Sequence, residues 1–156
     1  MIASGKLAGA CLLCDLGVHL CALPLFCVVE TMRPMLVDAL ADMPPFVLGL
    51  TVIRGAPTVV IDGARLIGVG CGTRPTRFVT IKADERCVAL AVDAVISVRH
   101  IPEGALEDLP PLLGEVSADF ISAIGTLDSD LMLVLRGGRL VPDSIWAAIA
   151  AAGGRP

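Results

Sequence analysis

The stretch that decides the fold reads Phe-Val-Leu-Gly-Leu-Thr-Val-Ile-Arg-Gly-Ala-Pro-Thr-Val-Val-Ile-Asp and occupies residues 46–62. It contains two runs rich in β-branched residues, Val47–Ile53 and Thr58–Ile61, which are typical of β-strands. Between them, Gly55-Ala56-Pro57 has the residue types that form turns. The stretch therefore predicts a β-hairpin, and the rest of the chain is interpreted around it.

Arg54 is the one charge between the two runs. A buried charge without a partner is very unfavourable, so an arginine in this apolar neighbourhood should have a carboxylate beside it. The nearest plausible upstream acid is Glu30. The apolar flanks favour a partly buried Glu30–Arg54 pair over a solvated surface pair. Removing one partner of such a pair should destabilise the protein more than the loss of an exposed pair does.

The composition bounds the class of protein. The 156 residues suit one domain, or two small lobes that share a core. Hydrophobic residues make up 55% and charged residues 18%, a surplus of apolar character that predicts an apolar surface or groove reserved for a partner. The net charge of −4 and the absence of Lys or Arg runs argue against nucleic acid and anionic membrane surfaces as partners. Aromatic residues, at 3%, are too few to stack bases.

Six cysteines lie inside apolar runs, which predicts free, reduced and buried thiols instead of a disulfide framework. Cys11-x-x-Cys14 is the only motif-like spacing, and no second Cys or His pair completes a zinc site. A thiol-dependent or metal-dependent protein, or one that binds a small apolar ligand near Cys11 and Cys14, is kept as the alternative function. Thiol titration with and without denaturant separates it from the main hypothesis.

The N-terminus faintly resembles a secretion signal, with Lys6 followed by the apolar run Leu7–Cys14. Asp15 ends that run early, and no stretch reaches the roughly 20 apolar residues that a membrane-spanning helix needs. We therefore expect a cytoplasmic protein without direct membrane insertion, and export is the minority alternative.

The remaining chain reads as many short strands with frequent Gly and Pro. In the first half we expect a hairpin at Leu12–Leu25, a short helix at Phe26–Arg33, a helical turn or loop at Val37–Met43 and a loop at Ala64–Pro75. Next we expect strands at Arg77–Lys82 and Cys87–Val98, with a turn at Asp84-Glu85 between them. The chain should end with an extended loop at Ile101–Gly114, a hairpin at Asp119–Leu135 and a final helix from Pro142 to Ala151. This pattern predicts an all-β barrel architecture.

Several short motifs follow one another along the chain: Cys21–Leu25, Val29-Glu30-x-x-Arg33, Pro45–Gly49, Ile53-Arg54-Gly55, Val59–Asp62, Val92-Asp93-x-Val95 and Phe120–Asp128. In content and order they resemble the motifs of the CheW family, the coupling proteins of bacterial chemotaxis. The resemblance covers about residues 12 to 150. One departure is Val52-Ile53-Arg54-Gly55, where the family has Asn-Leu-Arg-Gly.

The resemblance implies a mainly β protein of two SH3-like five-stranded β-barrel lobes packed on a shared apolar core, with a C-terminal helix. The corresponding boundaries are a CheW-like domain at 12–150, an N-terminal extension at 1–11 and a tail at 151–156. The implied function is that of an adaptor or scaffold in two-component signalling, with no enzymatic activity and no cofactor or metal. The implied location is the cytoplasm, at receptor arrays.

The implied partners are the regulatory domain of a CheA-type histidine kinase, bound through barrel-end contacts, and the tips of methyl-accepting chemoreceptors, bound in the apolar groove. The Glu30–Arg54 pair corresponds to a structural salt bridge of the family. The positions that the resemblance assigns to partner surfaces are Leu25, Val28, Glu30, Val37, Gly49, Ile53, Arg54 and Gly55.

No residue pattern predicts catalysis. Asp93 stands alone in an apolar run, and His19 and His100 lack a triad context. The glycine-rich segment 68–72 lacks the Lys-Ser/Thr pair of a phosphate-binding loop. We therefore expect no turnover of nucleotides or phosphodonors.

Overall fold

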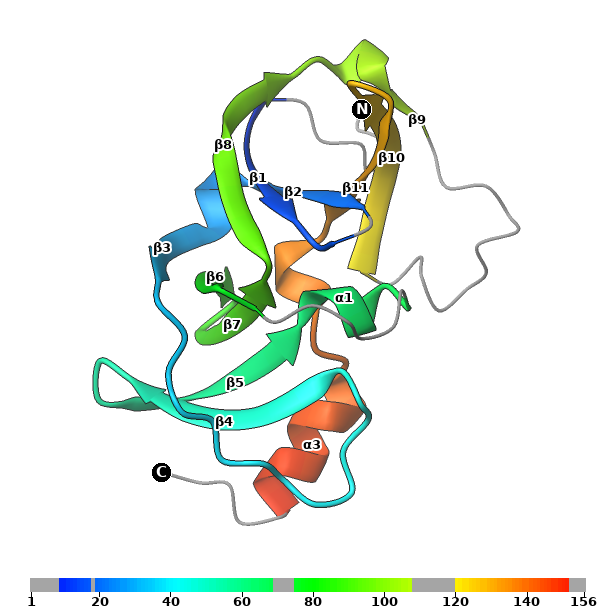
Figure 1. Ribbon diagram of the computed structural model, residues 1–156. Helices are drawn as coiled ribbons and strands as arrows, with labels where there is room; N and C mark the ends of the chain where they lie inside the picture. Colours follow the sequence, from blue (N-terminus) through cyan, green and yellow to red (C-terminus); the bar gives the residue numbers. More distant parts are fainter. Residues whose placement is uncertain (1–8, 18, 69–74, 108–119, 152–156) are drawn as a thin grey trace.

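The structure is a computed structural model that describes residues 9–17, 19–68, 75–107 and 120–151. Its strands form two sheets, one above the other in Figure 1. The first sheet has the order β8 (Ala94–Ile101), β1 (Gly9–Asp15), β2 (Leu20–Pro24), β11 (Asp130–Leu135), β10 (Ile121–Leu127), β9 (Leu106–Glu107). The second has the order β3 (Val28–Met32), β6 (Arg77–Ala83), β7 (Arg86–Val92), β5 (Ala56–Asp62), β4 (Val47–Ile53). The helices are short: η1 (Leu25–Cys27), α1 (Gly63–Leu66), η2 (Glu103–Ala105), η4 (Gly137–Arg139) and α3 (Asp143–Ala151).

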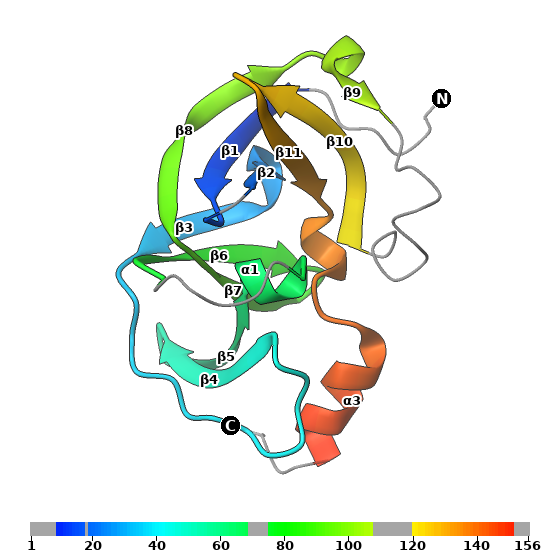
Figure 2. The ribbon, with the colours of Figure 1, turned by 45° about the vertical axis from the view of Figure 1, so that its right-hand side comes forward.

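The chain passes between the two sheets more than once. It begins in the first sheet with β1 and β2, builds the whole second sheet with β3 to β7, and returns to the first with β8 to β11. Helix α3 then packs back beside the second sheet, as Figure 1 and Figure 2 both show. The first sheet therefore joins segments far apart in sequence, whereas the second is built from the continuous stretch 28–92.

The described residues form three apolar clusters. The largest is the shared core between the sheets, to which both contribute; among its fully buried members are Leu23, Leu135, Ile61, Ile81 and Leu90. Smaller clusters fill the inside of each lobe, one around Leu13 and Met132, the other around Val60 and Phe78. Strand alternation explains this arrangement, because successive side chains of one strand point to the shared core and to the lobe interior in turn.

The predicted fold class is confirmed: the protein is mainly β, with two lobes on a shared apolar core and a C-terminal helix. The expected five-stranded closed barrels need correction. The first sheet has six strands, and in the described residues neither ladder closes, because β8 and β9 are the edges of one sheet and β3 and β4 the edges of the other. The two-residue β9 is too short to continue its ladder far.

The central hairpin is confirmed as β4 and β5, but its turn lies one residue earlier than expected. Arg54 and Gly55 both have positive φ, 53° and 80°, and Ile53 pairs with Ala56. This is the two-residue turn that matches the twist of a hairpin. Pro57 consequently lies within β5, opposite Val52, before the pairing of β5 with β7 begins at Val59.

Other expected elements are confirmed as well. The hairpins at the N-terminus and near residue 128 are β1–β2 and β10–β11, the Asp84-Glu85 turn joins β6 and β7, and the final helix is α3. The segment 37–43 is a loop with one bridging pair, and α1 occupies the start of the expected loop at 64–75. The described part of the expected loop at Ile101–Gly114 is not a simple loop, because it contains η2 and β9. The parts of the expected loops at 69–74 and 108–114 lie outside the described residues.

The expectations for one helix and one strand were wrong. The predicted helix at Phe26–Arg33 is instead η1 followed by strand β3, which is rich in β-branched residues and pairs with β6. The long strand Cys87–Val98 is two strands, β7 and β8, that belong to different sheets. Asp93 lies at the crossover, where its N–H donates to the carbonyl of Asp15 at 2.9 Å. Thr76 Oγ1 also donates to the Asp93 carbonyl.

The cysteines follow the prediction with one exception. Cys11, Cys14, Cys21 and Cys27 are free and buried. Cys87 is free but exposed near the start of β7, so the prediction of a buried thiol was wrong there. Cys71 lies outside the described residues.

Candidate functional site

The residues of the predicted ion pair lie on the two edges of the second sheet. Glu30 is in edge strand β3, and Arg54 is in the turn at the end of edge strand β4. Arg54 Nε donates to Glu30 Oε2 at 2.6 Å, and Arg54 Nη2 donates to Glu30 Oε1 at 2.7 Å. This bidentate ion pair links edge strand β3 to the turn after edge strand β4, which the backbone hydrogen bonds of the sheet do not join.

The pair is more exposed than the apolar flanks suggested. The Arg54 side chain is 77% exposed and the Glu30 side chain 26%. The hydrogen bonds from Arg54 lower the pKa of Glu30, and the same contact raises the pKa of Arg54. Only the Glu30 side of the pair is partly buried, and because solvent screens an exposed guanidinium, we expect a smaller effect on stability than a buried pair would have.

The backbone of Glu30 is held in place from the sheet interior. Its N–H donates to Thr80 Oγ1 at 3.1 Å, and Thr80 Oγ1 lies 3.3 Å from the Glu30 carbonyl oxygen, which it can donate to. Thr80 itself is buried in β6. The register of β3 shifts between Val28 and Glu30, as in a β-bulge, which redirects the side chains that follow.

The backbone of Arg54 carries a conformational cost. A two-residue hairpin turn with positive φ at both positions favours Asn, Asp or Gly, and an arginine there is disfavoured by its Cβ. The sequence nevertheless has an arginine with φ of 53° at this position. Local strain of this kind is typical of residues kept for a function of the side chain.

A shallow hollow of about 370 Å³ lies beside the pair. Its lining residues are Glu30, Met32, Arg33, Met35, Ile53 and Arg54, and we call this area the Glu30–Arg54 surface. Three residues that are each next in sequence to a lining residue also have exposed apolar side chains. These are Val29 at 51%, Leu36 at 96% and Val52 at 61% exposed.

The loop that carries Leu36 is fixed to β4 by three hydrogen bonds. Asp38 N–H donates to the Leu50 carbonyl at 2.8 Å, and Leu50 N–H donates to the Asp38 carbonyl at 2.9 Å. The buried hydroxyl of Thr51 donates to the Leu36 carbonyl at 2.7 Å. Leu36 is therefore held in solvent by an ordered backbone.

The positions assigned to partner surfaces divide into two groups. Leu25, Val28, Val37 and Gly55 join Glu30 and Arg54 as exposed or half-buried positions, although Val37 also packs against the interior of the second lobe. Gly49 and Ile53 are buried. Gly49 has a φ of 142°, and a Cβ there would lie 2.0 Å from the Asp38 carbonyl oxygen. Gly49 therefore lies against the loop that carries Leu36, whereas Ile53, although buried, lines the hollow.

The sequence reasoning missed the exposed apolar residues of this region. Phe26, Val29, Met35, Leu36 and Val52 are all exposed. The expected helix at Phe26–Arg33 did not predict that Phe26 and Val29 are exposed. The alternation of Val28 to Met32 was the available signal, because in an edge strand it points Val29 outward.

The described residues do not form a metal site or a pair of converging thiols. The described part of the chain contains no group of three or more His, Cys, Asp or Glu side chains that could hold a metal ion. Cys11 lies in the cluster inside the first lobe, whereas Cys14 lies in the shared core, so the two thiols of the motif do not converge. Within the described ranges no helix is long and apolar enough to span a bilayer.

Comparison with known proteins places the chain in a family. The model of the CheW-like domain matches residues 10–144. The crystal structure of the scaffolding protein TtCheW from Thermoanaerobacter tengcongensis is similar in fold, with a TM-score of 0.74 and 24% sequence identity over 87% of this chain and 94% of that one. A search of curated proteins finds no match. The family match extends over most of the sequence: the chain belongs to the CheW-like domain family and, like its members, is a chemotaxis scaffold and not an enzyme.

Proposed function

We propose that this protein couples methyl-accepting chemoreceptors to the regulatory domain of a CheA-type histidine kinase in the cytoplasm, and that the Glu30–Arg54 surface is one of its contact sites. Membership of the CheW-like family supports a coupling role of this kind. The strained Arg54, the ion pair between sheet edges and the flanking apolar side chains support the location.

The observation that carries the proposal is that Leu36 has an exposed side chain on a well-anchored backbone. A leucine that is 96% exposed gains nothing from the hydrophobic effect in the free protein. Its backbone is nevertheless fixed by a buried threonine and by a pair of bridging hydrogen bonds. Because this backbone is already fixed, little backbone freedom is lost when a partner covers the Leu36 side chain, which favours binding.

The experiment separates the two partners. The kinase regulatory domain and a receptor-tip fragment of the same host are each titrated with the protein by calorimetry. Val52→Thr and Arg54→Ala should weaken binding of at least one partner by about tenfold or more, as loss of a central contact does. The matched control is Val98→Thr on β8, a valine of similar exposure at 54% in the other sheet. Binding of both partners that is unchanged in Val52→Thr and Arg54→Ala would refute the proposed site.

The alternative of a thiol or metal centre at Cys11 and Cys14 receives no support from the geometry. Burial raises the pKa of the Cys11 thiol, which disfavours the reactive thiolate. Cys21, opposite Cys14 in the β1–β2 ladder, has a pKa raised well above the ordinary value by its contact with Cys14 and by burial. Both effects favour inert, structural thiols.

A further inference from the structure

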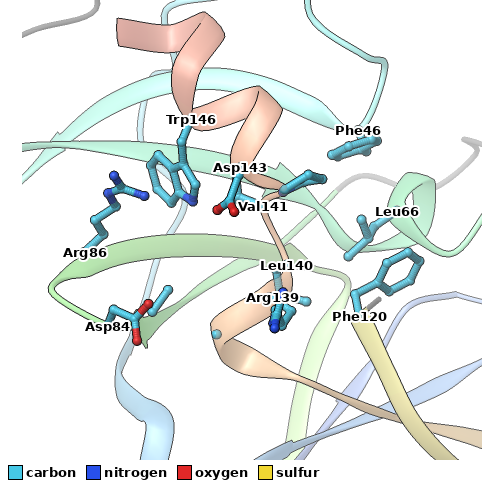
Figure 3. A pocket seen from close by; sticks show the side chains of 13 residues that line it. Phe46, Leu66, Asp84, Arg86, Phe120, Arg139, Leu140, Val141, Asp143 and Trp146 are labelled. Carbon is cyan, nitrogen blue, oxygen red and sulfur yellow. The ribbon is translucent and has the colours of Figure 1, made fainter. Parts of the chain in front are cut away.

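A second and deeper hollow lies at the opposite end of the β4–β5 hairpin from Arg54. It has a volume of about 400 Å³ and lies between α3, the β6–β7 turn and the residue that precedes β4. Figure 3 shows its lining side chains pointing into one space from these separate elements. Its size is within the range of small-molecule sites, toward the lower end.

Aromatic residues gather in this hollow although the chain has few. The protein has one tryptophan, four phenylalanines and no tyrosine, and the tryptophan and two of the phenylalanines line the hollow. Phe46, Leu66 and Phe120 form an apolar end, on the right in Figure 3. Leu140 and Val141 contribute to the apolar lining from the segment before α3.

The remaining lining of the hollow carries two negative and two positive charges. Asp84 and Asp143 supply two carboxylates, and Arg86 and Arg139 supply two guanidinium groups. The Arg86 guanidinium lies 4.5 Å from the centre of the Trp146 ring. Among the described residues, neither carboxylate and no guanidinium nitrogen of Arg139 has a hydrogen bond or ion pair. Beside its apolar wall, the hollow therefore presents two carboxylates and the Arg139 guanidinium without hydrogen-bond or ion-pair partners, whereas Arg86 lies over Trp146.

This combination selects among ligand classes. A simple carboxylic acid would meet two aspartates, and a simple amine would meet two arginines, so each would gain one attraction against one repulsion. A molecule that carries an ammonium and a carboxylate on neighbouring atoms, and an apolar group beyond them, satisfies both ends of the hollow. We propose that this hollow binds a free α-amino acid with an apolar side chain.

In this arrangement the α-carboxylate accepts hydrogen bonds from Arg139, and the α-ammonium donates to Asp143 or Asp84. The apolar side chain extends toward Phe46, Leu66 and Phe120. The site lies apart from the Glu30–Arg54 surface, so it stands or falls independently of the proposed coupling function. No bond is made or broken, and the role is that of a ligand site beside α3.

The test uses Trp146, which as the single tryptophan reports on this hollow alone. The full chain is titrated with L-leucine while tryptophan emission is followed, and heat is measured in parallel. A saturable change is expected. Binding should be weaker by about tenfold or more for 4-methylpentanoic acid, which lacks the ammonium, for 3-methylbutylamine, which lacks the carboxylate, and for glycine, which lacks the apolar group.

Two variants test whether Arg139 and Asp143 bind leucine. Arg139→Gln and Asp143→Asn change exposed side chains and should leave the melting temperature unchanged while reducing leucine affinity. The matched controls are Arg99→Gln and Asp130→Asn, exposed residues of β8 and β11 that do not line the hollow. Three results would overturn the proposal: no saturable signal up to about 10 mM leucine, equal affinity for the analogues that lack a charge, or wild-type affinity in both Arg139→Gln and Asp143→Asn.

Discussion

The shared core and the Glu30–Arg54 surface use apolar residues in opposite ways. In the shared core, leucines and isoleucines such as Leu90 and Ile61 are fully buried between two sheets, where they hold the lobes together. At the Glu30–Arg54 surface, Leu36 and Val52 are held in solvent by a backbone that is itself well anchored. The first region contributes stability. We expect the second to contribute little to it, and this difference supports the proposal that the surface serves binding.

The largest effect is expected in the shared core. Leu90→Ala removes a fully buried side chain and leaves a cavity, which should lower the free energy of unfolding by about 2–5 kcal/mol. Because the chain builds both sheets around this core, calorimetry should show one transition that moves to lower temperature as a whole. Two separate transitions, in wild type or variant, would contradict the idea of a shared core.

The next effect links the two regions. Gly49→Ala places a Cβ 2.0 Å from the Asp38 carbonyl oxygen, at a φ of 142° that suits glycine, so the loop bearing Leu36 must move. We expect a loss of about 1–3 kcal/mol in denaturant melts, together with weaker kinase or receptor binding. Gly104→Ala is the matched control, because a Cβ there meets nothing within 4 Å. Equal behaviour of the two variants would show that Gly49 does not position the loop.

Thiol reactivity distinguishes buried from exposed regions directly. In the native protein Cys87 should react quickly with a thiol reagent, whereas Cys11, Cys14, Cys21 and Cys27 should react only after denaturant is added. The variant Cys87→Ser should therefore lose the fast phase that belongs to this residue. Fast labelling of Cys11 or Cys14 in the native state would revive the alternative of a thiol-dependent function.

The smallest effect on stability is expected for the ion pair. Arg54→Ala, Glu30→Ala and the double variant should melt close to wild type, because the pair is exposed. The pKa of Glu30 is lowered in the folded state, so the unfolded chain binds more protons at acid pH. The small contribution of the pair is therefore present above the ordinary glutamate value of 4.5 and is lost as the pH falls through the lowered pKa. Single variants that are strongly destabilised, with a double variant that recovers, would restore the hypothesis of a buried pair.

The sequence predicted much of this molecule. The hairpin at 46–62 follows from its β-branched runs, and the family follows from ordered motifs that the domain match confirms. The partnership of Arg54 with an acid was expected from charge alone, but its exposure was not. The neighbours of Arg54 along the chain are apolar, which suggested burial. The exposure of the ion pair instead follows from the position of both residues at the edges of the second sheet.

Other features could not be predicted because they depend on contacts between distant segments. The interruption at Asp93 reflects a crossover between sheets that apolar runs alone do not reveal. The hollow beside α3 combines Phe46, Arg86, Phe120 and Trp146 from four separate elements. The outward position of Leu36 depends on a hydrogen bond from Thr51, fifteen residues away in sequence.

The most direct test of the central claim is Leu36→Asn, with unfolding and partner binding measured on the same preparation. A side chain that is 96% exposed should leave the free energy of unfolding within about 0.5 kcal/mol of wild type. We predict that binding to the kinase regulatory domain or to the receptor tip nevertheless falls by about tenfold or more. A variant that binds both partners like wild type, or one that loses binding only because it unfolds, would contradict the account.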